Sequence, residues 1–153
     1  MKLIWIAAFS VLSLAGCQKA SACSAPTDQK QWSIRAQDAL GKVDSWDSLH
    51  DYYKAYVQNI CQSGGIEDSY VDAVAIRFTR HWPELDRYAA LSTNDSGFKA
   101  FVMAKLATPL YGLDDARTTY KLARDQCPAA FNQQCSEIMQ ALLTAYPITI
   151  KDN

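Results

Sequence analysis

The sequence lacks the residue patterns on which most catalytic and metal sites depend. It has two histidines, His50 and His81, and neither belongs to an H-E-x-x-H motif. No serine stands in a nucleophile elbow. None of the five cysteines forms a C-x-x-C pair, so the spacing of structural zinc sites and of dithiol redox sites is missing. We therefore expect no catalytic residue, no metal and no cofactor.

An excess of charge of one sign is also missing. The chain has 15 basic and 16 acidic residues and a formal net charge of −1. Nucleic-acid partners need a basic stripe, and anionic lipid surfaces need a polybasic patch. Neither kind of surface is indicated, so we expect no nucleic-acid partner.

No apolar run is long enough to cross a membrane, and the longest one lies near the start of the chain. Residues 3–14 (LIWIAAFSVLSL) are almost wholly apolar and follow Lys2. The run is too short to cross a bilayer as a helix, which takes about 20 apolar residues. A basic start, a short apolar core and small residues after it are typical of a secretory signal peptide.

The end of this stretch, Leu14-Ala15-Gly16-Cys17, resembles the lipobox of bacterial lipoproteins. The resemblance implies that residues 1–16 are removed and that Cys17 carries lipid, which makes the membrane a partner through that lipid. Gln18 rather than Asp follows the cysteine, which by the same resemblance implies the outer membrane, facing the periplasm. The alternative is an ordinary signal peptide with a chance cysteine.

The rest of the chain predicts an all-α fold, a compact array of six to seven short helices behind the signal peptide. We divide it into a lipidated tether (17–26), a helical domain (27–147) and a C-terminal tail (148–153). Apolar residues at steps of three and four, with caps, prolines and glycines between them, indicate the helices. They are expected from Thr27 or Asp28 to Leu40, from Asp44 or Ser45 to Cys61, from Glu67, from Pro83 to Leu91, over 98–106, from Asp114 to Cys127, and from Pro128 to Pro147. No alternating apolar run is long enough to predict a strand.

Four cysteines follow the lipobox, and in an exported chain they predict two disulfides with three alternative pairings. We favour Cys127 with Cys135, because a proline corner joins the last two helices between them. Cys23, in the tether, would then bond to Cys61. The alternative joins Cys61 to Cys127 or to Cys135.

The second helix carries the residues of greatest functional interest. Trp46, Tyr52 and Tyr56 lie on two of its faces, and one set is expected to form an exposed aromatic interface unless neighbouring helices cover both. Asp44, Asp47 and Asp51 are read as helix N-terminal charge rather than as a cation site. Both histidines are expected to be exposed or capping.

The leading hypothesis is a non-enzymatic lipoprotein that binds another protein, as an envelope accessory or as a toxin-immunity protein. The chain is similar to helical periplasmic immunity proteins only in size, helicity and disulfides. The alternative is an envelope enzyme acting on cell-wall material, with His50 and Asp47 or Asp51 at its site.

Overall fold

The computed structural model describes residues 28–58 and 67–147, and within these ranges it contains helices and no strand. The predicted all-α fold is confirmed. The helices are α1 (Gln29–Leu40), α2 (Trp46–Tyr56), α3 (Glu67–Arg80), α4 (Leu85–Asn94), α5 (Ser96–Leu106), α6 (Leu113–Asp125) and α7 (Asn132–Ala145), with short 3₁₀ turns η1 (Trp82–Glu84), η2 (Pro109–Tyr111) and η3 (Ala129–Phe131).

Side-chain caps start the first two helices where the sequence predicts. Asp28 accepts a hydrogen bond from the Gln31 backbone N–H at 3.0 Å. Ser45 and Ser48 cap each other's backbone N–H groups at 3.2 and 3.0 Å. These bonds satisfy donors that the first turn of a helix leaves without partners.

Two predicted helix ends are wrong. Asp114 does not cap α6; that position belongs to Gly112, whose φ of 82° lies in the left-handed region that favours glycine. α2 ends at Tyr56 rather than near Cys61. The N–H groups of Val57 and Gln58 both donate to the Tyr53 carbonyl oxygen, each at 2.9 Å. Because two donors share one acceptor, the regular series of helical hydrogen bonds ends here.

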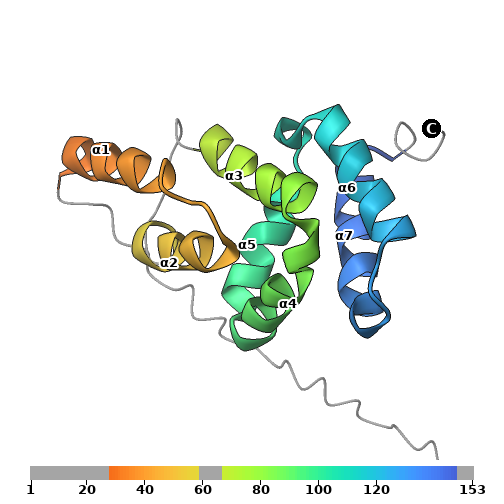
Figure 1. Ribbon diagram of the computed structural model, residues 1–153. Coiled ribbons are helices and arrows are strands. Elements are labelled where there is room, and N and C mark those ends of the chain that lie inside the picture. The colour runs from red at the N-terminus through yellow and green to blue at the C-terminus, as the bar shows by residue number, and fades with distance from the viewer. Residues whose placement is uncertain (1–27, 59–66, 148–153) are drawn as a thin grey trace, which may run out of the picture.

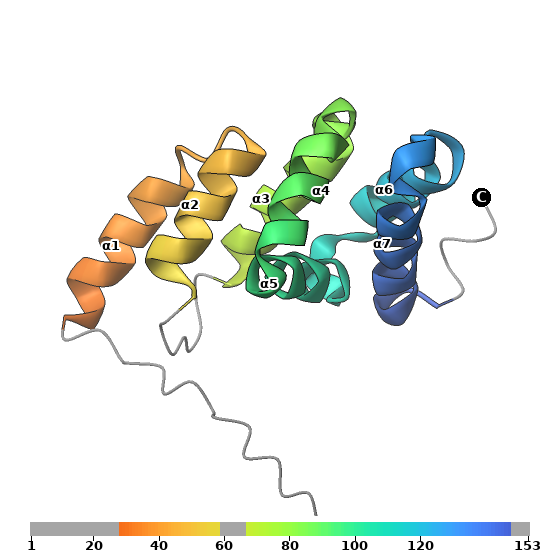
Figure 2. The same ribbon diagram turned by 90° about the horizontal axis from the view of Figure 1, so that it is seen from below.

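The helices form an irregular array rather than a straight bundle. Figure 1 shows α3 and α5 in the middle, with α1 and α2 on one side and α6 and α7 on the other. In Figure 2 α5 is seen nearly end-on while α4 lies in the plane, so neighbouring helices cross at steep angles. Helix α3 packs against α1 and α6, and α5 packs against α7. On its other side α5 meets α2 through the rings of Phe98 and Phe101, which contact Tyr53.

Aromatic rings fill the core. Trp46 is 1% exposed, and its ring centroid lies 4.9 Å from Phe78 and 4.8 Å from Tyr88. Tyr52 and Tyr70 join α2 to α3 through their hydroxyl groups, 3.2 Å apart. Each aromatic side chain removes a large apolar area from water, and tilted pairs add to that stabilisation.

Helix α1 lies at one edge of the array (Figure 2). A narrow stripe of buried side chains holds it there. Of its described side chains, Trp32 and Ala36 are buried. They lie one turn apart and face α2 and α3. Much of the surface of α1 therefore remains available on either side of that stripe.

Candidate functional site

The C-terminal corner holds a disulfide between Cys127 and Cys135, with Cα atoms 6.2 Å apart. This predicted pairing is confirmed. Cys127 follows the C-cap of α6 and so lies in the turn, from which it reaches the buried Cys135 on α7. Bridging requires Cα atoms about 4.4 to 6.8 Å apart, which two residues on one straight helix at this separation could not satisfy.

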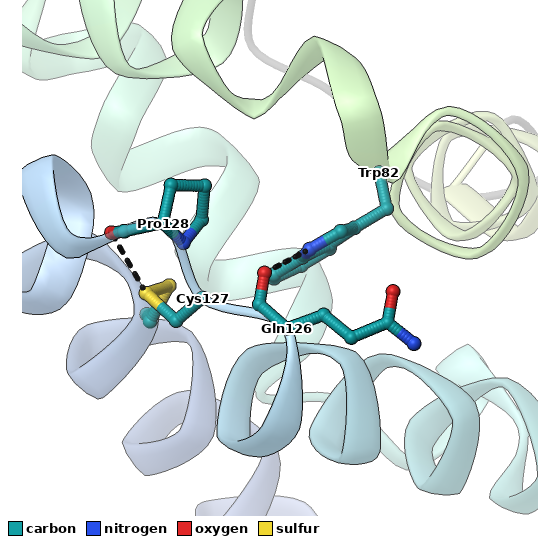
Figure 3. Close-up of a disulfide and its surroundings, with 5 residues drawn as sticks. Trp82, Gln126, Cys127 and Pro128 are labelled. Atoms are coloured by element: carbon teal, nitrogen blue, oxygen red, sulfur yellow. Dashed lines mark hydrogen bonds between the residues drawn. A yellow bond between two sulfur atoms is a disulfide. The ribbon is translucent and has the colours of Figure 1, made fainter.

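Two further contacts surround this corner (Figure 3). The Trp82 indole N–H donates to the Gln126 carbonyl oxygen at 3.1 Å, which ties η1 to the end of α6. The Cys127 sulfur lies 3.5 Å from the Pro128 carbonyl oxygen; a disulfide sulfur carries no proton, so this is a packing contact. A covalent bond within a packed corner, without a second thiol nearby in the described chain, acts as a structural staple.

His50 is buried, so the expectation of an exposed histidine is wrong for it. Its Nε2 donates to Asp95 Oδ2 at 3.0 Å. Asp95 also caps α5 by accepting from the Phe98 N–H at 2.9 Å. The Phe98 N–H and then the His50 ring hold the pKa of the Asp95 carboxyl below its usual value. This pair joins α2 to the start of α5.

The surroundings of His50 are aromatic rather than nucleophilic. The Phe98 ring meets it edge-on at 4.8 Å, and Tyr53 stacks parallel to it at 6.5 Å. Burial and the nearby Asp95 carboxylate raise the pKa of the Tyr53 hydroxyl. A Cβ on Gly97 would come within 2.5 Å of that hydroxyl oxygen, so a side chain at this position would press the two elements apart.

His81 is half-buried and makes a local ion pair. Its Nδ1 lies 3.0 Å from Glu84 Oε1, three residues further along the chain. It occupies the N-cap position of η1, but its side chain makes no capping hydrogen bond. His81 therefore has neither a fully exposed nor a capping side chain, and the expectation holds only for its position in the chain.

Asp44 precedes α2, Asp47 and Asp51 lie on it, and the three aspartates have different surroundings. Asp47 pairs with Arg87 of α4, whose Nε donates to it at 2.8 Å and lowers the pKa of the Asp47 carboxyl. Asp44 accepts from the Ser48 hydroxyl at 3.2 Å. Asp51 faces a groove instead. The described part of the chain holds no cluster of ligands fit for a metal ion.

Of the two aromatic sets on α2, one was expected in the core and the other exposed. Trp46 is 1% exposed, because Phe78 of α3 and Tyr88 of α4 pack on its ring. Tyr52 is also buried, at 3% exposed, because Tyr70 of α3 packs against it, so the exposed interface is wrong for Tyr52 as well. Tyr56 is half-buried, and its ring lies 5.0 Å from Tyr52 and 6.3 Å from Trp32. Tyr52 and Tyr56 still contribute edges to the surface described next.

A groove of about 520 Å³ lies between α1 and α2, and we call it the α1–α2 groove. Its lining alternates small, aromatic and charged side chains. It is formed by Arg35, Asp38, Ala39, Lys42 and Val43 on the α1 side and by Ser48, Asp51, Tyr52, Ala55 and Tyr56 on the α2 side. The three charges on the α1 side were missed from the sequence, although a spacing of three residues places Arg35 and Asp38 on one helix face. Lys42 follows in the turn after α1.

Two smaller hollows lie between other pairs of helices. One of about 430 Å³ lies between α1 and α3, and one of about 320 Å³ lies between α5 and α7. The second is bordered by the Lys99–Glu137 ion pair, at 2.7 Å, which lowers the pKa of the Glu137 carboxyl. The α1–α2 groove is the largest of the three and has the most charged residues.

Arg77 is the one buried side chain here whose charge has no close partner among the described residues. It is 5% exposed, and its Nε and Nη1 have no hydrogen-bond acceptor. Burial lowers the pKa of its guanidinium, with Glu84 and Asp44 opposing that shift from a distance. It lines none of the three hollows described above.

The residues of the predicted lipidation site and of the predicted second disulfide are not among those that the structure describes. Cys17, Cys23 and Cys61 lie outside the described residues. Non-reducing peptide mapping tests the predicted Cys23–Cys61 bond: a peptide that links these two cysteines supports it, and Cys61 bonded to any other residue contradicts it.

Within residues 28–58 and 67–147, no helix combines the length and the apolar character that crossing a membrane requires. Comparisons of the chain with protein-family models, with curated proteins and with solved structures give no match. Function is therefore argued from the residues and their geometry.

Proposed function

We propose that this chain is a lipid-anchored module of a bacterial cell envelope that binds another protein through the α1–α2 groove. The observation that carries the proposal is the groove itself. It offers small side chains at Ala39 and Ala55, aromatic edges at Tyr52 and Tyr56, and a charged rim. Protein interfaces combine such an apolar and aromatic centre with a polar border.

The location part of the proposal rests on the N-terminal residues. The lipobox-like sequence ending in Cys17 is followed by the short polar stretch 18–26 and then by α1. One wall of the groove thus belongs to the first helix after the tether. A partner would be another component of the envelope, either part of an assembly machine or a toxin that this chain neutralises.

The alternative, an enzyme acting on cell-wall material, has less support from the geometry. It needs His50 beside Asp47 or Asp51 in an open polar cleft. His50 instead pairs with Asp95 at 3.0 Å among aromatic rings, and Asp47 pairs with Arg87. Asp51 lines the α1–α2 groove without a histidine in that lining.

Site-specific photo-cross-linking in living cells tests the proposal. A benzophenone amino acid replaces Ala55 in the groove, and Ala90, an exposed alanine on α4, is the matched control position. We expect a discrete protein adduct from position 55 and none from position 90. The adduct should disappear when Ala39→Trp fills the groove. Identical adducts from both positions, or none from position 55, would contradict a groove-specific partner.

A further inference from the structure

The α1–α2 groove carries its charges in a definite order along its length. On the α1 side, Arg35 and Lys42 stand at the two ends and Asp38 lies between them. On the α2 side, Asp51 lies between Ser48 and Ala55, in the middle part of that wall. The order along the groove is therefore positive, negative, positive.

From this order we infer that the occupant of the groove is an amphipathic helix with acidic, basic and acidic residues at successive steps of three or four, beside an apolar stripe. The inference rests on the proposed function and specifies the chemistry of the partner. Opposite charges facing each other across an interface select the partner and set its register.

These four charges are available to such a partner. Arg35, Asp38, Lys42 and Asp51 are all exposed, and within the described ranges none of them makes an ion pair. Arg35 and Asp38 are three residues apart on α1, a spacing at which opposite charges can pair, yet they do not, and neither does Lys42 in the turn after α1. Their neighbour Asp47, outside the groove lining, is by contrast satisfied by Arg87.

The spacing favours a helix over an extended segment. The step from Arg35 to Asp38 corresponds to a rise of about 4.5 Å along α1, and Lys42 stands in the turn two residues after the end of that helix. A partner helix with an acid and a base three residues apart keeps the pairs with Arg35 and Asp38 aligned. An extended chain presents every second residue to one side, about 6.6 Å apart, so two charges on one face would overrun Arg35 and Asp38 by about 2 Å.

The uncharged residues that line the groove can accommodate the apolar side of a helix. Ala39 and Ala55 lie on opposite walls, and their small side chains let another helix approach closely. The Tyr52 and Tyr56 rings, 5.0 Å apart, supply the flat apolar surface beside them. Docking of an apolar helix face into such a groove is a recurring mode of peptide recognition.

The other parts of this chain do not carry the inferred pattern. Residues 17–27 contain one charged residue, Lys19, and residues 59–66 contain none. Residues 148–153 contain Lys151 and Asp152 side by side. None of these stretches has an acid on either side of a base at helical spacing, so the occupant belongs to another protein.

Two synthetic peptides of the same composition test the inference. Both have an apolar stripe on an alanine-rich helix. One has Glu, Lys and Glu at three- and four-residue steps and a second Lys on the opposite face; the other has Lys, Glu and Lys and a second Glu there, so that each peptide contains two Glu and two Lys. Binding to the detergent-solubilised full-length protein is measured by fluorescence anisotropy at low salt. We expect the acid-base-acid peptide to bind at least tenfold more tightly, with the difference shrinking as salt rises.

The double variant Arg35→Glu/Lys42→Glu should reverse the preference between the peptides, which a mere loss of folding cannot do. The matched control Arg80→Glu/Lys121→Glu changes the net charge equally at exposed positions outside the groove, and it should keep the wild-type preference. Equal binding of both peptides, no binding of either, or a preference unchanged in Arg35→Glu/Lys42→Glu overturns the inference. If these peptide results contradict the inference but the cross-linked adduct from position 55 is still found, the groove binds a protein partner of different chemistry. If that adduct is also absent, the inference and the proposed function are both wrong.

Discussion

Replacing Asp95 by alanine should destabilise the fold more than the loss of an ordinary helix cap. The carboxylate caps α5 through the Phe98 N–H and also accepts from His50, with side-chain exposures of 18% for Asp95 and 11% for His50. Loss of an N-cap costs about 1 kcal/mol. Leaving the buried imidazole without its partner costs about 1 to 3 kcal/mol more. We therefore expect Asp95→Ala to lower the free energy of unfolding by about 2 to 4 kcal/mol.

Asp95→Asn separates the two roles. Asparagine caps helices about as well as aspartate, so the remaining loss, about 1 kcal/mol, reports the charge that faces His50. Because the folded pKa of Asp95 lies below its unfolded value, the stabilisation is fully present above the unfolded pKa, near 3.9. It is lost as the pH falls through the folded pKa, so the wild type and Asp95→Asn should converge in stability below about pH 4.

Urea unfolding followed by circular dichroism at 222 nm measures each difference. A double-mutant cycle of Asp95→Ala with His50→Ala isolates their interaction, for which we expect a coupling of about 1 to 2 kcal/mol. A coupling near zero, or a loss below about 1 kcal/mol in Asp95→Ala alone, would refute the view that this pair joins α2 to α5.

Three further predictions concern other parts of the chain. Cys127→Ser with Cys135→Ser should lower the free energy of unfolding by about 2.5 kcal/mol, since the bond closes a loop of eight-residue separation; dithiothreitol should lower the unfolding midpoint of the wild type more than that of the variant, which keeps only the predicted Cys23–Cys61 bond. Arg77→Met should leave the unfolding free energy unchanged or raise it by about 1 kcal/mol, because it removes a buried charge without a close partner, and a loss above 1 kcal/mol would show that the charge stabilises the fold. Metabolic labelling with a fatty-acid probe should mark the wild type and not Cys17→Ser; equal labelling would disprove lipidation there.

Local features of the sequence determined most of the secondary structure. Asp28 and Ser45 begin helices because their side chains bond to backbone groups only three residues away. Pro83 and Pro109 stand in the first turns of 3₁₀ segments, where a missing N–H costs nothing. Even the Cys127–Cys135 pairing spans only eight residues and one corner. Such short-range interactions are nearly the same whatever the rest of the chain does.

Only the tertiary structure decided what each helix face meets. His50 and Asp95 are 45 residues apart, and nothing near either residue indicates the other. From the spacing of apolar residues along α2 alone, Tyr52 was a candidate for an exposed position. It is buried because α3 packs over it, and its hydroxyl group donates a hydrogen bond to the hydroxyl group of Tyr70. Periodicity shows that a helix has two faces with different residues, and it does not show how many neighbouring helices will cover them.

The α1–α2 groove depends on tertiary structure for the same reason. Arg35, Asp38 and Lys42 read in the sequence as ordinary surface charges of one helix. They line a groove only because Trp32 and Ala36 seat α1 on a narrow stripe, which sets its distance from α2. The sequence determined which charges share a face of α1, while packing against a separate helix determined that this face borders a groove.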